Sequence, residues 1–515
     1  MKKVEIDSGI LQYVPKGAYY EGQDEQFTKV FDMWKKLFLF DRTLFSLMML
    51  LSGTGFSKGM MTHFLLSNEQ ENLGKALVPA SLASNYETQI IKYNLAKERT
   101  PRALKNLLLL CGDVKLNKVN NSRTRKIILE YIFNRSHDDL DNLAINYKNK
   151  LKTLIRHALG KQTLFKILNG NLVQFEKLIG RYNKNAGPVV YYIFNKEYPK
   201  KSISAYFKKI NQCIQLREAA SKKDADAFEN LMKGLPLRTV MGFRNTYRVP
   251  IEIKDVMEDT SVSTKEALQM QSAAKRVGGK IKVDYKKQDI YDLWKILYHK
   301  VLTGEKDDVE LIFKALNEIK LDKVDIGETV IIIDASKSMY GSDQRPLHPF
   351  LTALSISAMI ENVKAVIYIG GKLTSVETEV TQTEIGWQGT SIIIPSGGTP
   401  LWRGLIDAVI TGIKNIVVIS DGYENSVKGT FDLVYKHFKN AGYDFNLTHI
   451  NPVFAADAQK GTVRRIAEEI NPLPITDYKF LETEIIFQKM IENKDLVKKL
   501  LVNRYQKLIG GGRTE

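Results

Sequence analysis

Apolar and polar residues follow different patterns in the two parts of this chain. From about residue 27 to residue 316, apolar residues recur at i, i+3, i+4 and i+7, for example at Leu104, Leu107, Leu108 and Cys111. This spacing is typical of amphipathic helices that bury one face. Glycine and proline are sparse there and lie between the stripes. The pattern predicts a dozen or so helices joined by short turns, most simply an all-α solenoid of stacked, HEAT-like helix pairs.

We place the helical pattern at residues 28–320, with one irregular stretch before it and one within it. Residues 1–27 are polar and rich in turn-forming residues, and we interpret them as an N-terminal arm. Residues 250–282 combine an acidic run, a Ser/Thr-rich run and Gly278-Gly279, which predicts a long loop or linker between helices. The helical stretch contains no convincing repeat of fixed period.

After Lys320 the pattern changes to alternating strands and helices. Its order, βαββαβαβα, predicts an α/β Rossmann-like domain over residues 326–515, in which helices cover a mostly parallel sheet. Residues 376–380 alternate between polar and apolar, as in an antiparallel edge strand. We expect strands at 328–333, 365–369, 376–380, 415–419 and 446–450, and helices at 347–361, 401–413, 430–441, 459–470 and 484–508.

The first predicted strand ends abruptly in polar residues. The apolar run 329–333 has no polar alternation, which suits a strand covered on both faces, and Asp334-Ala-Ser336-Lys-Ser338 follows it directly. In open α/β sheets, ligands bind in the crevice beyond the carboxyl ends of the strands. An aspartate and two hydroxyls at alternate positions can place three oxygens around one hard cation, and Mg²⁺ favours such a site.

Two further stretches would complete the same group of oxygens. Thr399 lies in the Gly-rich stretch Ser396-Gly-Gly-Thr399-Pro400, before an apolar-periodic segment, and Asp421 follows the buried run 416–419. Each fragment alone also fits a helix cap or a turn. Because three fragments occur in order at strand-to-helix junctions, they favour a site for Mg²⁺ or Mn²⁺. The set resembles the metal-ion-dependent adhesion site of the von Willebrand factor A domain, with all five positions matched: Asp334, Ser336, Ser338, Thr399 and Asp421.

The bulk properties indicate a globular intracellular protein. The chain has 515 residues, enough for two or three domains, and 44% of them are apolar. No apolar segment follows the first lysines, so we expect no secretory signal, and the apolar run 44–51 is too short to span a bilayer. Cys111 and Cys213 lie far apart without metal-like spacing. We therefore expect a cytoplasmic protein with no membrane partner.

The positive charge is concentrated in the first part of the chain. The formal net charge is +17; residues 1–325 hold 55 Lys+Arg against 37 Asp+Glu, or +18, and residues 326–515 hold 20 against 21, or −1. A basic domain joined to a neutral one implies a polyanionic partner, most commonly nucleic acid. The alternative is a positive surface without such a partner.

Basic residues of the helical part form three clusters, interleaved with aromatic residues in the third. Lysine and arginine neutralise phosphates, and aromatic rings stack on unpaired bases. This mixture therefore favours binding of RNA or single strands over recognition of a duplex through its major groove. The alternative is a set of solvated helix faces around core aromatics. The candidate RNA-binding residues are Lys115, Lys118, Arg123, Arg125, Lys126, Lys152, Arg156, His157, Lys161, Lys200, Lys201, Lys208 and Lys209.

A basic helical part followed by an A-type domain resembles the Ro autoantigen family, which is built from a TROVE module and a von Willebrand factor A domain. Residues 228–245 look like the family segment in which a Leu-Pro-Leu step leads into a helix ending Arg-Asn, and residues 154–159 are similar to its basic Leu/Arg/His helix. The first stretch adds Arg238 and Arg244 to the candidate RNA-binding residues. The resemblance implies a helical ring that binds small non-coding RNAs on its outer surface and admits single-stranded ends of misfolded RNA.

An enzyme is the less favoured hypothesis. A haloacid-dehalogenase-like site would need a second aspartate at position 336, where Ser336 stands. A P-loop at Gly370-Gly-Lys372 would need a glycine in place of Val366. We therefore expect no catalysis. The stronger alternative to RNA binding is a metal-dependent protein-binding scaffold or adaptor, in which a carboxylate of a protein ligand completes the metal shell.

Overall fold

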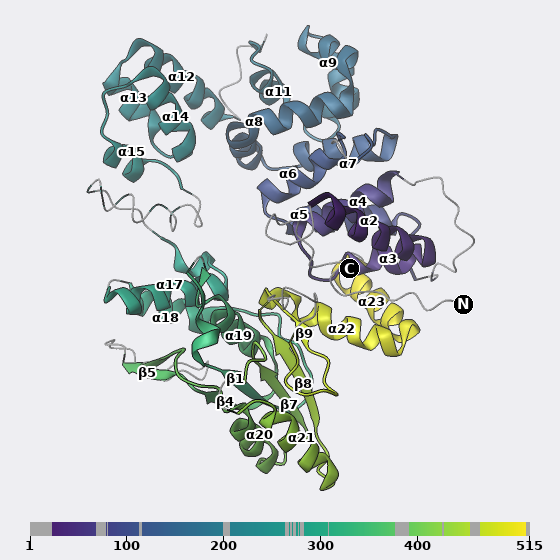
Figure 1. Cartoon of the computed structure of the whole chain (residues 1–515). Coiled ribbons are helices and arrows are strands. Elements are labelled where there is room, and N and C mark those ends of the chain that lie inside the picture. Colours follow the sequence, from purple (N-terminus) through teal and green to yellow (C-terminus); the bar gives the residue numbers. More distant parts are fainter. Residues whose placement is uncertain are drawn as a thin grey trace. The chain divides into compact units, whose positions relative to one another are not determined.

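The computed structural model describes residues 23–67, 79, 81–112, 116–198, 207–262, single positions between 267 and 278, 283–306, 308–343, 345–375, 391–424, 427–453 and 464–510. The chain forms two compact units (Figure 1). One unit, here the helical unit, consists of residues 1–283 together with 493–515. The other, the sheet unit, consists of residues 284–492.

The helical unit contains only helices and connecting segments in its described part, as the sequence predicted. Its longest helix, α8, is bounded by Ser136, whose hydroxyl accepts the N–H of Asp139, and by Gly160, whose φ of 78° ends the helix. The elements are α2 (Gln23–Phe40), α3 (Arg42–Met48), α4 (Gly55–Ser67), α5 (Tyr86–Lys97), α6 (Thr100–Leu109), α7 (Ser122–Phe133), α8 (His137–Leu159), α9 (Lys161–Leu168), α10 (Leu172–Phe175), η1 (Glu176–Gly180), α11 (Gly187–Ile193), α12 (Lys208–Lys222), α13 (Ala225–Met232), α14 (Leu237–Tyr247), α15 (Ile253–Asp259) and α23 (Lys494–Leu508).

Helix α8 lies at the centre of the packing in this unit. It contacts α6, α7, α9, α11 and α12, and its apolar face, including Leu151, Leu154 and Ile155, is fully buried. Non-helical backbone angles at Tyr147 kink the helix. The predicted stripe of Leu104, Leu107 and Leu108 lies on α6, where Leu104 and Leu107 are buried.

Two boundaries differ from the sequence prediction. Helix α2 begins at Gln23, so the end of the expected arm 1–27 is helical. Residues 253–259, within the expected linker 250–282, form α15, whose Val256 and Met257 are buried. The sequence analysis missed this helix because its apolar residues, Ile253, Val256 and Met257, span only about one turn within an acidic run.

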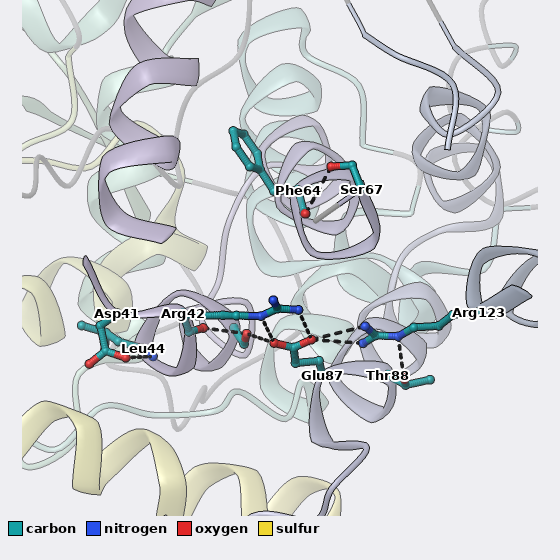
Figure 2. A network of polar contacts seen from close by, with 9 residues as sticks. Asp41, Arg42, Leu44, Phe64, Ser67, Glu87, Thr88 and Arg123 are labelled. Carbon is teal, nitrogen blue, oxygen red and sulfur yellow. Dashed lines mark hydrogen bonds and ion pairs between the residues drawn. The ribbon is translucent and has the colours of Figure 1, made fainter. Parts of the chain in front are cut away.

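A buried carboxylate joins three helices of this unit (Figure 2). Glu87 of α5 accepts hydrogen bonds from Arg42 of α3, at 2.7 Å from Nε and 3.0 Å from Nη2, and from both terminal nitrogens of Arg123 of α7, at 3.3 Å. Arg123 Nε also donates to Thr88 Oγ1 at 2.8 Å. Two guanidinium groups therefore compensate one buried carboxylate.

The C-terminal helix α23 belongs to the helical unit. Its Lys498 and Lys494 form ion pairs with Asp41, at 3.0 and 3.3 Å, and Asp41 caps α3 by accepting the N–H of Leu44. The hydroxyl of Tyr505 donates to Gln89. The last helix thus packs on helices near the start of the chain.

The sheet unit is built around a five-stranded parallel sheet, consistent with a Rossmann-like domain. The strand order is β4-β1-β7-β8-β9, and all neighbouring pairs are parallel. The elements are η3 (Tyr285–Lys287), α17 (Ile290–Thr303), α18 (Val309–Glu318), β1 (Thr329–Asp334), η4 (Lys337–Tyr340), β2 (Gly341–Ser342), β3 (Arg345–Pro346), α19 (His348–Met359), β4 (Val363–Ile369), β5 (Lys372–Ser375), β6 (Ser391–Ile394), α20 (Leu401–Ile410), β7 (Asn415–Ile419), α21 (Thr430–Asn440), β8 (Asn446–Asn451), β9 (Leu473–Pro474), η5 (Tyr478–Phe480) and α22 (Leu481–Glu492).

Strand β1 is the centre of this unit, and all six of its residues are buried. Its Val330 and Ile332 pack in one core with Leu405 of α20 and Phe431 of α21. Helix α19 packs against β1 from the opposite face of the sheet (Figure 1). Coverage on both faces explains why the run 329–333 is continuously apolar.

The predicted strands at 328–333, 365–369, 415–419 and 446–450 are confirmed as β1, β4, β7 and β8. The helices predicted at 347–361, 401–413 and 430–441 are confirmed as α19, α20 and α21. The predicted strand 376–380 lies outside the described residues. An antiparallel pair does occur beside it, between β5 and β6.

Two helix predictions near the C-terminus are wrong. Of the expected helix 459–470, the described residues 464–470 form turns and irregular backbone. The expected single helix 484–508 is two helices, because Asn493 has extended backbone angles and caps α23 by accepting the N–H of Leu496. The second error arises because an apolar stripe that continues in phase across a turn looks the same as one unbroken helix.

The two compact units divide the chain differently from the domains expected at 28–320 and 326–515. Helix α17 packs with the sheet unit: the hydroxyl of Tyr298 donates to the carbonyl of Ile393 at 2.9 Å, and its ring contacts Phe350 edge-on. Helix α23 packs with the helical unit instead. Across the described residues, no helix is long and apolar enough to cross a membrane.

Candidate functional site

The strand order places the two predicted carboxylate ligands, Asp334 and Asp421, at one edge of the sheet. In chain order the five strands β1, β4, β7, β8 and β9 are arranged 2-1-3-4-5, so the connection from β4 to β7 crosses over β1. The crevice beyond the carboxyl ends of β1 and β7 is therefore the topological switch point, where open α/β sheets bind ligands. Asp334 ends β1, and Asp421 lies two residues beyond the end of β7.

The turn after β1 holds the first three candidate ligands. The backbone N–H of Ser336 donates to Asp334 Oδ1 at 2.9 Å, and the hydroxyls of Ser336 and Ser338 lie 3.0 Å apart. Asp334 and Ser336 are fully buried. The Asp-x-Ser-x-Ser spacing thus folds into a turn that orients one carboxylate and two neighbouring hydroxyls.

Backbone hydrogen bonds attach the Thr399 loop to this turn. Lys337 N donates to Gly397 O at 3.2 Å, and Ser396 N donates to Ala335 O at 2.9 Å. Gly370 has a φ of 82°, and a Cβ there would lie 3.0 Å from the Gly398 carbonyl, so glycine is needed for this close approach. Thr399 itself is fully buried.

The end of β7 supplies the second carboxylate and a hydroxyl that the sequence analysis missed. Ser420 Oγ donates to Asp334 Oδ2 at 2.8 Å, and Asp421 Oδ1 accepts the N–H of Tyr423 at 3.0 Å. Asn451 at the end of β8 donates to the Asp421 carbonyl at 3.1 Å. Ser420 was visible as a polar residue ending an apolar strand, but only the parallel pairing of β1 and β7 places it against Asp334.

Burial disfavours the ionised forms of both Asp334 and Asp421, and for Asp334 a like charge adds to this effect. Burial, followed by the charge of Asp421, raises the pKa of Asp334 to about 7, against the hydrogen bonds from Ser336 and Ser420. Burial also raises the pKa of Asp421, while the Tyr423 N–H, the Ser338 hydroxyl and the Arg464 guanidinium act to lower it. Two close, buried carboxylates are unfavourable without a compensating cation.

This set of donors fits a hard divalent cation. Carboxylate and hydroxyl oxygens are ligands of the kind that Mg²⁺ accepts, and a cation would offset the repulsion between Asp334 and Asp421. The hydrogen bonds join Asp334, Ser336 and Ser338 into one group, and Ser338 interacts with Asp421. Thr399 is placed by the loop that hydrogen-bonds to this group.

The predicted RNA-binding residues fall into three sets. Several have exposed side chains on the helical unit: Lys118, Arg125, Lys126, Arg156, Lys161, Lys208 and Arg238. Lys152, Lys209, Arg123 and Arg244 are half-buried, and His157 is buried. Lys115, Lys200 and Lys201 lie outside the described residues.

Four of these side chains hold the fold together. His157 Nε2 donates to the carbonyl of Val119 at 2.8 Å, and Arg123 binds Glu87. Arg244 Nε donates to Ile251 O at 2.6 Å, and Lys209 Nζ donates to Asn142 Oδ1 at 3.0 Å. Sequence spacing alone does not separate such structural cations from surface ones.

His157 nevertheless influences the exposed cluster, because it fixes the segment that carries Lys118. Burial lowers its pKa, and the positive charges of Lys118 and Arg125 lower it further. The lowered pKa favours a neutral ring, and the charges of Lys118 and Arg125 both act on it. Lys118 and Arg125 thus belong to one local basic surface.

No protein-family model and no curated protein matches this sequence.

Proposed function

We propose that this chain is a non-catalytic RNA-binding protein of the Ro type. Its basic helical unit, a TROVE-like module, binds small non-coding or misfolded RNA. Its sheet unit is a von Willebrand factor A domain with a metal-dependent ligand site. The helical part is proposed to be a HEAT-like solenoid, and RNA is the principal partner.

The observation that carries this proposal is the charge of the two compact units. Residues 1–283 and 493–515 hold 53 Lys+Arg against 29 Asp+Glu, a net charge of +24, whereas residues 284–492 hold 22 against 29, a net charge of −7. The boundaries of the folded units thus separate the charge more sharply than the boundaries taken from the sequence, which gave +18 and −1. A unit with so large a positive excess attracts polyanions.

In the sheet unit, Asp334, Ser336, Ser338, Thr399 and Asp421 would hold Mg²⁺ or Mn²⁺. When bound, the cation would offer an open coordination position to an anionic oxygen of a ligand. The residues of this chain orient the donors: Ser420 fixes Asp334, and Asn451 fixes the backbone of Asp421. Because this unit is negative overall, it does not attract a polyanion at long range, so we propose a protein ligand there.

RNA binding by the full-length chain is tested by measuring how its affinity depends on salt concentration. Affinity for a single-stranded RNA should fall steeply with salt, with a log–log slope of roughly −0.7 per phosphate contacted. Replacing Lys118, Arg125 and Lys126 together with alanine should reduce that slope by roughly 2 if each contacts one phosphate. Arg123 is left intact, because its loss would disrupt the Glu87 network.

A charge-matched control separates local contact from net charge. The triple variant with alanine at Lys295, Lys372 and Lys428, all exposed on the sheet unit, loses the same charge and should keep the wild-type slope. Equal slopes in the two triple variants would remove this cluster from the RNA-binding surface. A chain that purifies without nucleic acid and binds no RNA at physiological salt would instead favour the protein-binding adaptor.

Chelation of the metal tests whether RNA binds at a site separate from the metal site or at the metal itself. On this proposal EDTA leaves RNA affinity unchanged, because phosphates bound by lysine and arginine need no cation. A loss of RNA affinity common to EDTA and to Asp421→Ala would contradict the two-site arrangement and place an RNA phosphate at the metal.

A further inference from the structure

The helical unit contains a cavity of about 540 Å³ beside the basic surface of Lys118. One face of α2, the C-terminal end of α4 and the extended segment 116–121 line it. Its volume is in the range of small-molecule sites, which is roughly 300–1,000 Å³.

Aromatic rings form the inner wall of the cavity. Phe31 of α2 and Phe64 of α4 lie with ring centroids 4.7 Å apart, and Phe38 lies 6.1 Å from Phe64. Phe38 and Phe64 are buried, Phe31 is half-buried, and Leu39 at the rim is 48% exposed. Phe64 lies at the end of α4, where the Ser67 hydroxyl donates to its carbonyl (Figure 2). The wall therefore offers an apolar surface of tilted aromatic rings with an accessible edge.

The opposite wall is polar and fixed in position. His63 Nε2 donates to Asn117 O at 2.8 Å, and His157 Nε2 donates to Val119 O at 2.8 Å, so two buried histidines hold alternate carbonyls of one segment. Asn121 Nδ2 donates to Leu66 O at 2.7 Å and anchors the end of that segment to α4. The side-chain amide of Asn117 is exposed and makes no hydrogen bond with a described residue, so it can pair with the edge of a base.

The charge on the described cavity lining is positive only. Lys35 and Lys118 are both exposed, and neither forms an ion pair with a described residue. None of the described residues that line the cavity is a carboxylate. A ligand for this site therefore combines an apolar part that packs on aromatic rings with a negative charge.

We propose that this cavity binds one unpaired nucleotide of an RNA strand, with the base against Phe31 and Phe64 and a phosphate beside Lys35 and Lys118. Stacking of a base on aromatic side chains and phosphate neutralisation by lysine are the two contacts that single-strand binders combine. The inference rests on the proposed RNA-binding function and specifies where in the helical unit a base is held.

Calorimetric titration of the full-length chain with adenosine 5′-monophosphate (AMP) tests this site. AMP should bind more tightly than adenosine, which lacks the phosphate, and more tightly than inorganic phosphate, which lacks the base. Lys35→Ala and Lys118→Ala should each weaken AMP binding at least fivefold. Lys36→Ala is the matched control, because Lys36 is the exposed neighbour of Lys35 and does not line the cavity.

A blocking variant makes the test independent of charge. Leu39→Trp places a larger ring at the rim, from a position exposed enough to accept it, and should abolish AMP binding without lowering the melting temperature. Wild-type AMP affinity in this variant and in both lysine variants would overturn the proposal. So would tight binding of laurate together with no binding of AMP, because the cavity would then hold an amphiphile.

The two proposals fail in different ways. If AMP does not bind while RNA binds with a steep salt dependence, the nucleotide site is wrong and the RNA-binding function stands. If AMP binds in the cavity but the chain binds no RNA, the nucleotide site stands and the RNA-binding function is wrong.

Discussion

Ser420 Oγ donates a hydrogen bond to Asp334 Oδ2 at 2.8 Å and so joins the carboxyl end of β7 to that of β1. The other carboxylate oxygen of Asp334 accepts the N–H of Ser336. Both oxygens are thus oriented by the protein, and the carboxylate is held in place within the crevice. Hydrogen bonds of this kind to metal ligands typically change metal affinity about 10- to 100-fold.

Mg²⁺ should stabilise the sheet unit through Asp334. At 100 times the dissociation constant, binding to the native state raises the free energy of unfolding by about 2.7 kcal/mol. Asp334→Asn should lose this gain, yet in EDTA it should be no less stable than wild type, because it removes one of two neighbouring buried charges. Ser420→Ala should weaken Mg²⁺ binding about tenfold. Thermal unfolding and calorimetric titration measure both effects.

Asp407→Asn is the control for this comparison, because Asp407 is an exposed carboxylate on α20 of the same unit. If Mg²⁺ raises the melting temperature of Asp334→Asn as much as that of Asp407→Asn, the crevice does not bind the ion.

The sheet unit should fold from residues 284–492 and lose stability when it begins at 326. The shorter segment lacks α17, whose Trp294 and Tyr298 are buried at 2% and 0% exposure. Loss of one buried large aromatic side chain costs about 3–5 kcal/mol. Urea unfolding of 284–492 and 326–492 compares them directly. Equal stabilities would mean that α17 is not part of this core.

Glu87→Gln should destabilise the helical unit by about 2–3 kcal/mol. The substitution leaves Arg42 and Arg123 facing each other without the carboxylate, in a site where the three side chains keep only 11–22% exposure. Glu130→Gln is the matched control: its ion pair with Lys92 is more exposed, so we expect a loss of about 0–1 kcal/mol. Similar losses in the two variants, measured by urea unfolding, would contradict a special role for Glu87.

Lys498→Ala should destabilise the helical unit by about 1–2 kcal/mol at pH 7, because Asp41 then loses one charged partner. Burial acts to raise the pKa of Asp41, but the Leu44 N–H and the ammonium groups of Lys498 and Lys494 lower it below its usual value of 3.8. The stabilisation from this group is therefore present above pH 4 and lost as pH falls further. The difference in the free energy of unfolding between Lys498→Ala and wild type should shrink in that acid range.

Lys499→Ala, at the exposed neighbouring position, is the control for this prediction and should match wild type at every pH. A pH-independent effect of Lys498→Ala on the free energy of unfolding would mean that its alkyl chain, and not its charge, stabilises α23.

Asp141 should make the helical unit more stable at mildly acidic pH. Burial raises its pKa to about 6, although its carboxylate accepts the N–H groups of Lys209 and Ile210. Because the folded-state pKa is above the unfolded-state value, the contribution to stability grows as pH falls through 6 towards 4. As pH falls from 7 to 5, we expect the free energy of unfolding of wild type to rise by about 1 kcal/mol relative to that of Asp141→Asn.

Chemical unfolding at several pH values checks this slope. The control is Asp226→Asn, which changes an exposed carboxylate and should keep the wild-type pH dependence. An unchanged pH dependence in Asp141→Asn would show that this carboxylate stays ionised in the folded protein.

The local order of residues was sufficient to predict the elements that carry the candidate metal site. Continuous apolar runs such as 329–333 and 416–419 predict buried parallel strands, and the aspartate that follows each run must lie at the carboxyl edge of the sheet. Helical periodicity likewise predicted the helical part. These features are determined by the sequence because side-chain alternation and helical repeat are properties of neighbouring residues.

Contacts between distant residues were decided only by the tertiary structure. Periodicity predicts that α17 and α23 are amphipathic helices, but not that α17 covers the sheet unit or that α23 packs on Asp41. In the same way, the spacing of basic residues does not distinguish Lys118, which is exposed, from Arg123, which neutralises Glu87. A stripe shows which face of a helix is buried, whereas its partner depends on complementary packing and charge from elsewhere in the chain.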